Sequence, residues 1–245
     1  MEETKRRPFA VSLLVSLIDR PATALAEIAA YPRWRWVLPV ILLIGAMIAS
    51  IVLTGPLTVE QTQQAVQQQL ATLPAEQAEM ARAQIARLQQ PQVLLATAIG
   101  TGLIGLLLSW LMASAFLYFG VLIAGGDVSF TGLFATLPWT WLPFALRDVV
   151  QTGYILYKNE LIANPGLSYF VSTGKPVEDA GKLLYNVLAR VDLFTLWHLA
   201  LVFVVLWVLP RFSKGKAFVL VLVYAALSLG LRLVPSLLVR AFMPG

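Results

Sequence analysis

The sequence predicts an all-α membrane protein, a polytopic bundle of transmembrane helices. Of its 245 residues, 58% are hydrophobic and 13% are charged, whereas about 25% of the residues in a soluble domain carry charge. Several apolar stretches are long enough to cross a bilayer core of about 30 Å as α-helices. The longest polar stretch keeps a helical repeat of apolar residues. We therefore expect five transmembrane helices, an N-terminal interfacial helix and an extracytoplasmic helical hairpin.

The composition also excludes several classes of site. The chain has no cysteine and one histidine, His198, so disulfides, thiol catalysis, iron–sulfur clusters and multi-histidine metal sites are excluded. Six of the 18 basic residues precede Val37, which is typical of a membrane-orientation signal and not of nucleic-acid binding. We expect no metal, no cofactor and no nucleic-acid partner.

The apolar stretch within the N-terminal segment, residues 1–35, is too short to span a bilayer. Its apolar residues recur at near-helical spacing across Pro21, which predicts a helix lying along the membrane surface. The residues of this stripe are Phe9, Leu13, Leu17, Leu25 and Ile28.

An interfacial anchor follows at Arg33, Trp34, Arg35 and Trp36. Tryptophan prefers headgroup depth, and arginine extends its charge outward to water from the same depth. This run therefore predicts the start of the first span.

Five spans are expected after the anchor. The third contains Pro138 and Pro143, and prolines remove backbone hydrogen bonds that other groups must replace. We place the spans at about residues 36–54, 93–124, 130–157, 191–209 and 217–242.

Residues 55–91 change to glutamine, alanine and scattered charge, and predict a helical hairpin outside the bilayer. Thr58-x-x-Gln61 has the form of a capping box, and Leu73-Pro74 separates two apolar helical stripes, the second including Ile85 and Leu88. The hairpin is either a docking surface or a lid packed on its own membrane domain. A second polar connection, residues 158–190, is expected to end in an amphipathic helix, Val177 to Arg190, that runs into the fourth span.

Basic residues predict the orientation. They concentrate before the first span and after the fourth, at Arg211, Lys214 and Lys216. The positive-inside rule then places the N-terminus in the cytoplasm and the C-terminus outside, in a cell membrane.

Charges inside the spans predict an intramembrane polar cluster of Arg147, Asp148, Asp192 and Arg232. Counted along a helix, three spans place these groups about 25 Å from the inner end, in the outer third of the bilayer. Arg147 and Asp148 point about 100° apart on a helix, so we expect pairs between helices instead. Such pairs either lock the bundle or line a polar cavity that opens outward.

His198 and Thr195 lie one helical turn apart in the fourth span. They could add a polar lining to such a cavity. Equally, His198 could be a histidine whose hydrogen bonds are satisfied within the bundle.

Three motifs carry a resemblance to a known family. They are Pro32-Arg33-Trp34-Arg35-Trp36, Gly125-Gly126, and Asp192-Leu-Phe-Thr-Leu-Trp197-His198. In these the chain resembles a bacterial member of the Yip family (Ypt/Rab-interacting protein, YIPF-type domain), over residues 21 onward. The resemblance implies one membrane domain, residues 1–245, with five spans and a cytoplasmic N-terminus. Eukaryotic members are associated with small GTPases and vesicle traffic, but the aspartate-leucine-tyrosine-glycine-proline motif is missing ahead of the first span.

Two functions remain open. The first is a non-enzymatic scaffold or adaptor in membrane organisation or trafficking, which binds lipid, another membrane protein or a second copy of itself. The alternative is a small transporter or channel with a polar site in the outer third of the bilayer. Neither G-x-S-x-G nor H-E-x-x-H occurs in the sequence, so we do not expect an enzyme.

Overall fold

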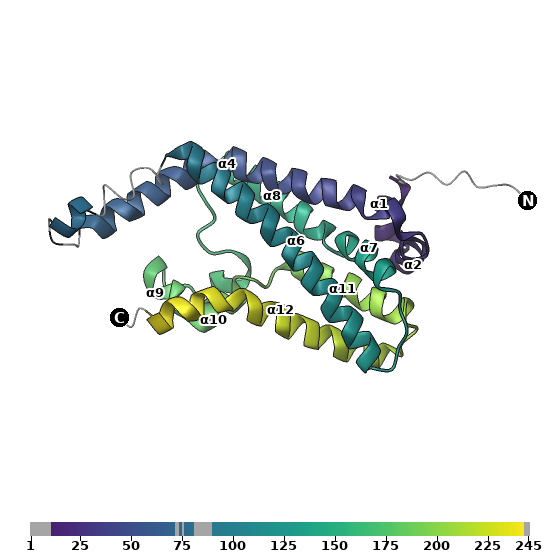
Figure 1. Cartoon of the computed structure of the whole chain (residues 1–245). Coiled ribbons are helices and arrows are strands. Elements are labelled where there is room, and N and C mark those ends of the chain that lie inside the picture. The colour runs from purple at the N-terminus through teal and green to yellow at the C-terminus, as the bar shows by residue number, and fades with distance from the viewer. Residues whose placement is uncertain (1–10, 72–73, 75, 81–89, 243–245) are drawn as a thin grey trace, which may run out of the picture. The chain divides into compact units, whose positions relative to one another are not determined.

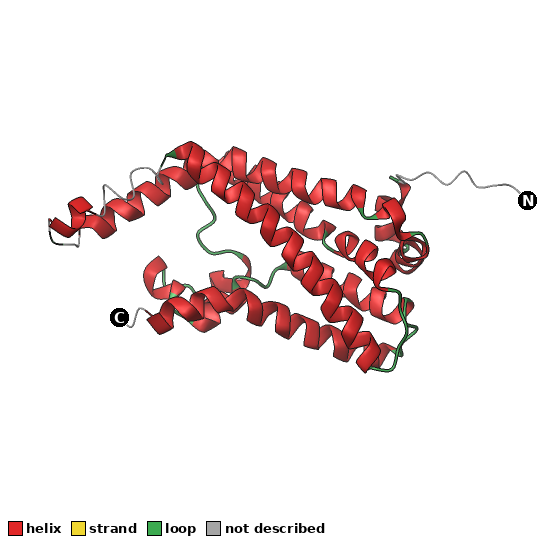
Figure 2. Cartoon of the chain, in the orientation of Figure 1, coloured by secondary structure: helices red, strands yellow, loops and turns green. Residues whose placement is uncertain are grey.

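The computed structural model describes residues 11–71, 74, 76–80 and 90–242 (Figure 1). Throughout these ranges every regular element is a helix and none is a strand (Figure 2), which confirms the all-α prediction. The residues group into two compact units. The first comprises Met1–Leu43, Ser109–Phe144 and Ala163–Gly245, and the second comprises Ile44–Leu108 and Ala145–Ile162.

The first unit begins with a layer of three short helices, α1 (Ser12–Asp19), α2 (Pro21–Ala30) and α3 (Pro32–Arg35). Proline opens α2 and α3 at the first helical position, where its missing N–H costs no intrahelical bond. α2 packs against α7 (Phe130–Thr140) and α11 (Leu193–Val208). Leu25 and Ile28 are fully buried there, and Leu13 and Leu17 of α1 are buried as well. These four residues of the stripe expected to face the membrane thus face the protein core, whereas Phe9 lies outside the described residues.

The predicted third span is two helices in the structure. α7 ends at Thr140 with Trp141 as its C-cap, and α8 runs from Leu142 to Lys158. Pro143 stands at the second position of α8, where its ring would clash with the carbonyl of residue 139 in a continuous helix. Ser129 caps α7 by accepting a hydrogen bond from Gly132 N at 3.1 Å.

The second polar connection is more divided than the sequence predicted. It contains the 3₁₀ turn η1 (Gly166–Val171) and the short helices α9 (Pro176–Ala180) and α10 (Leu183–Leu188). The expected continuous helix from Val177 into the fourth span is therefore wrong. The helix is broken at Lys182, whose backbone is extended before α10, and again at Asp192, which adopts an extended backbone and caps α11. α11 packs against α2, α7 and α12 (Lys214–Phe242).

The second unit contains most of α4 (Val37–Ala71) and the first half of α6 (Pro91–Ile123). α4 continues through Pro56 without a break. The capping box predicted at Thr58 is wrong, because Thr58 Oγ1 donates to Thr54 O at 3.1 Å inside the helix. The first predicted span and the first hairpin helix are thus one helix. Residues 76–80 are helical, whereas Ile85 and Leu88 of the second predicted hairpin helix lie outside the described residues.

Small residues let α4 and α6 approach closely in this unit. A Cβ added at Gly102 would lie 2.9 Å from Met47 Sδ, and one added at Gly55 would lie 2.6 Å from Leu95 Cδ2. Close packing through small residues is typical of helices in a bilayer.

Three helices in the described part of the chain are long and apolar enough to cross a membrane, over Pro32–Gln68, Pro91–Ile123 and Lys214–Leu231, and α11 is a shorter apolar helix. Large apolar side chains stand exposed along them, which suits contact with lipid better than with water. On α6 these include Ile104, Leu107, Leu111, Phe119 and Ile123. The fold is that of an all-α membrane helix bundle, and the count of five spans stays a prediction.

Candidate functional site

The predicted interfacial anchor forms one wall of a structured site in the first unit. Arg35 does not extend outward as predicted, because its side chain is 11% exposed and its Nη2 donates to Glu27 Oε1 at 2.9 Å. The backbone carbonyl of Arg35 accepts a hydrogen bond from Trp139 Nε1 at 2.9 Å. Arg33 and Trp34 remain exposed. Arg35 therefore ties α3 to both α2 and α7.

One donor of Arg35 remains unused by the described residues. Nη1 is buried and has no hydrogen-bond partner among them. A buried, unpaired donor on a charged group is unfavourable, so an acceptor that reached this nitrogen would stabilise the site.

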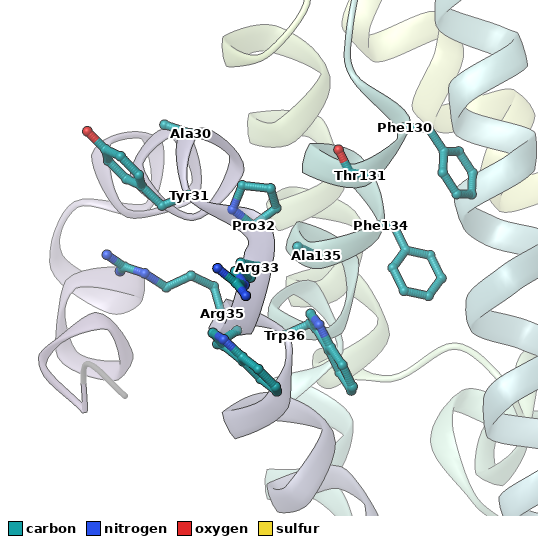
Figure 3. A pocket seen from close by; sticks show the side chains of 11 residues that line it. Ala30, Tyr31, Pro32, Arg33, Arg35, Trp36, Phe130, Thr131, Phe134 and Ala135 are labelled. Carbon is teal, nitrogen blue, oxygen red and sulfur yellow. The ribbon is translucent and has the colours of Figure 1, made fainter. Parts of the chain in front are cut away.

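A pocket of about 620 Å³ opens beside Arg35 (Figure 3). It lies where α3 meets the first turns of α7, and Figure 3 shows Phe130 and Phe134 across the pocket from Tyr31. Its lining residues are Ala30, Tyr31, Pro32, Arg33, Trp34, Arg35, Trp36, Phe130, Thr131, Phe134 and Ala135. We call this the α3–α7 pocket.

Stacked aromatic rings support one side of the α3–α7 pocket. The Trp110 ring stacks on Phe134 with centroids 4.1 Å apart, and it is tilted against Trp36 with centroids 5.5 Å apart. Trp110 Nε1 donates to Phe134 O at 2.8 Å, so the indole is fixed by a hydrogen bond as well as by stacking.

Three charges of the predicted intramembrane cluster, Arg147, Asp148 and Asp192, have local partners. Arg147 Nε lies 3.6 Å from Asp148 Oδ1, so the expectation that these neighbours would not pair is wrong. The long arginine side chain reaches around the helix despite the angle of about 100° between adjacent positions. Asp192 Oδ1 accepts a hydrogen bond from Thr195 N at 2.7 Å, as the cap of α11.

The predicted four-residue cluster itself stays a prediction. Arg147 and Asp148 belong to the second unit and Asp192 to the first, and the side chain of Arg232 lies outside the described part of the chain. Neither the α3–α7 pocket nor the second pocket described below is lined by any of the four.

His198 joins three helices of the first unit. It is 5% exposed, its Nδ1 lies 2.9 Å from Thr140 O, and its Nε2 lies 3.2 Å from the Tyr224 hydroxyl. Because a carbonyl oxygen only accepts, Nδ1 carries the proton in the neutral ring and Nε2 accepts from Tyr224. Thr195, its expected companion, donates its hydroxyl to Arg190 O at 3.1 Å. Both side chains thus make structural hydrogen bonds.

A second pocket, of about 550 Å³, lies between α4 and α6 in the second unit. Thr54, Thr58, Thr62 and Thr101 line it, and each donates its hydroxyl to a carbonyl of its own helix. Its walls therefore offer methyl groups and oxygen lone pairs, but no free hydroxyl hydrogen from these four residues.

Asp179, which the sequence analysis missed, organises the second polar connection. It is buried and accepts hydrogen bonds from Ser172 Oγ, Thr173 N and Thr173 Oγ1, each at 2.8 Å, and from Lys182 Nζ at 3.2 Å. Burial alone would raise the pKa of this carboxyl, but the hydrogen bonds outweigh burial and hold the pKa well below its ordinary value. The neighbouring Ser172-Thr173 and Gly174 were the signal available for such a turn.

The lowered pKa of Asp179 predicts a pH dependence of stability. Its contribution is fully present above the unfolded-state pKa of about 3.9 and is lost as pH falls through the lower folded-state value. We expect Asp179→Asn to lower the melting temperature at pH 7 and to reduce the further loss on acidification to pH 2. Thermal unfolding of both proteins across this range is the measurement. Glu178→Gln, which removes an exposed carboxylate beside Lys175, is the control, and an equal effect of both variants would contradict the role of Asp179.

Among the described residues no group of three or more His, Asp and Glu side chains could hold a metal ion. The helices and their lipid-facing apolar side chains define the class as an all-α integral membrane protein. A model of the Yip1 domain matches residues 15–234, a range that begins within α1 and ends within α12. The chain therefore belongs to the Yip1 domain family, as the sequence motifs predicted. Comparison with curated proteins and with solved structures gave no match.

Proposed function

We propose that this Yip1-domain protein is a non-enzymatic membrane scaffold or adaptor that binds a partner protein or lipid through its α1–α3 layer. The observation that carries the proposal is the difference between the two sides of that layer, one of which is buried and the other exposed. One side packs on α7 and α11, while Val11, Val15 and Ile18 of α1 stand 63%, 69% and 72% exposed. A packed helix with an unburied apolar stripe is a docking element on a fixed base.

The charges inside the apolar helices support the same choice. Arg147 pairs with Asp148, Asp192 caps α11, and His198 bonds Thr140 and Tyr224. Each of these groups has a structural role within the protein, so the presence of these polar groups does not require transport of an ion to explain it. With the N-terminus predicted to be cytoplasmic, the docking layer faces the cytoplasmic leaflet.

The alternative is a small transporter or channel. It is favoured by the break between α7 and α8 at Trp141, since transporters build their sites from interrupted helices. It requires the predicted cluster of Arg147, Asp148, Asp192 and Arg232 to line a path through the outer third of the bilayer.

Flux and cross-linking measurements separate the two functions. In proteoliposomes we expect ion or solute flux equal to that of protein-free vesicles, and no change on Arg147→Ala. In cells, a photo-cross-linking residue at exposed Val15 should label a partner or lipid, whereas the same residue at buried Leu13 should not. Gradient-driven flux that Arg147→Ala abolishes would overturn the scaffold proposal and establish the alternative.

A further inference from the structure

We propose that the α3–α7 pocket binds an anionic phospholipid, with its phosphate on Arg35 and Arg33 and its glycerol and upper acyl carbons along the aromatic side. The inference rests on the proposed function and deepens it, because it names the lipid class and the site.

The first support is the state of Arg35. One of its terminal nitrogens is bonded to Glu27, while the other, Nη1, is buried without a partner among the described residues. Its side chain is about nine-tenths buried. A phosphate oxygen satisfies such a donor with a short, charge-assisted hydrogen bond. A hydrogen bond from the same donor to water is weaker, because water carries no charge.

The second support is the charge of the pocket. Arg33 and Arg35 line it, and no acidic side chain occurs among its described lining residues. Phe130 and Thr131 also line it and form the first turn of the 11-residue helix α7. Ser129 already accepts from Gly132 N, but the positive dipole end of a helix start still favours an anion. Glu27 offsets one positive charge only, so the pocket keeps a net positive potential.

The third support distinguishes a lipid from a free phosphate ion. Trp34, Trp36, Phe130 and Phe134 give the pocket a largely aromatic lining, which an inorganic ion would leave unused. Its volume of about 620 Å³ lies within the range of about 300–1,000 Å³ that is typical of small-molecule sites. The pocket also lies at the start of the candidate span Pro32–Gln68, where tryptophan and arginine meet lipid headgroups.

Binding to detergent-purified full-length protein tests the proposal. Dioctanoyl phosphatidylglycerol, dioctanoyl phosphatidylcholine and inorganic phosphate are titrated separately, with native mass spectrometry to count bound molecules and tryptophan fluorescence to report on the pocket. We expect one tightly bound phosphatidylglycerol, and binding of phosphatidylcholine and phosphate weaker by about tenfold or more. The choline cation of phosphatidylcholine is repelled by Arg33 and Arg35, and inorganic phosphate lacks the apolar contact.

Three matched variants sharpen the test. Arg35→Gln should weaken phosphatidylglycerol binding by about tenfold or more. Arg20→Gln removes the same charge from the same segment at an exposed side chain paired with Asp19, and should change binding by less than about twofold. Glu27→Gln should instead tighten binding, because it removes the negative charge that offsets Arg35.

Thr131→Trp tests the pocket without touching a charge or the Arg35–Glu27 pair. Thr131 is an exposed lining residue, so the larger side chain fills the pocket, and phosphatidylglycerol should no longer bind. Equal binding of phosphatidylcholine or of phosphate, equal effects of Arg35→Gln and Arg20→Gln, or unchanged binding in Thr131→Trp would each overturn the inference. These binding measurements are independent of the flux measurement. The proposed lipid site can therefore fail its test while the scaffold proposal still stands.

Discussion

Gly166→Ala is expected to lower the free energy of unfolding by about 2 kcal/mol or more, because the new side chain meets backbone it cannot displace. Gly166 has φ of 59°, in the left-handed region that side chains rarely adopt. An added Cβ would lie 2.6 Å from Val191 O, 2.9 Å from Leu188 O and 3.1 Å from Ala189 O. These carbonyls belong to the link between α10 and α11, so the clash would strain the entry to α11.

Gly174→Ala is the matched control. Gly174 lies in the same connection and also has positive φ, 77°, but an added Cβ would meet nothing within 4 Å. Its substitution should cost about 1 kcal/mol, the backbone term alone. Thermal unfolding of both purified variants in one detergent gives the comparison. Equal losses would show that the carbonyl packing around Gly166 contributes nothing.

His198→Ala should lower the free energy of unfolding by about 2–4 kcal/mol, since it leaves a void and two polar groups without partners. The groups are the Thr140 carbonyl and the Tyr224 hydroxyl, which His198 links across α7, α11 and α12. The ring centroid of Phe144 also lies 5.0 Å from that of His198, so packing is lost as well.

Tyr224→Phe separates the hydrogen bond from the packing. It keeps the ring and removes only the hydroxyl, so we expect a loss of about 0.6–1 kcal/mol, as for other hydrogen bonds between membrane helices. Unfolding in mixed micelles with increasing denaturing detergent is the measurement. If His198→Ala costs no more than Tyr224→Phe, then His198 is not a structural link.

The sequence predicted the helical membrane class because long apolar stretches leave few alternatives in a bilayer. It identified Pro138 and Pro143 as disturbances of the third span, but it did not place the break between α7 and α8. It failed after Thr54, where the change of composition and the Thr58-x-x-Gln61 pattern suggested an end to the first span. In the structure the helix continues, and hydroxyls of Thr54 and Thr58 bond carbonyls one turn earlier. Such local rearrangement around a proline is not encoded in the spacing of apolar residues.

The site depended on contacts that spacing alone does not give. Arg35 and Glu27 are eight residues apart, so they meet only because the chain turns between α2 and α3. The bond from Trp139 to Arg35 O spans 104 residues, and no local pattern indicates it. In contrast, the arginine–tryptophan run was found from sequence, because both residue types have a known preference for headgroup depth.

Because α4 is one unbroken helix, its length can be compared with the thickness of a bilayer. Its 35 residues measure about 52 Å at 1.5 Å per residue, whereas the hydrocarbon core of a bilayer is about 30 Å thick. The helix is therefore roughly 20 Å longer than the core is thick. Tilt of the helix or projection beyond the lipid tails would take up this excess, and each added or removed turn would change it by about 5.4 Å.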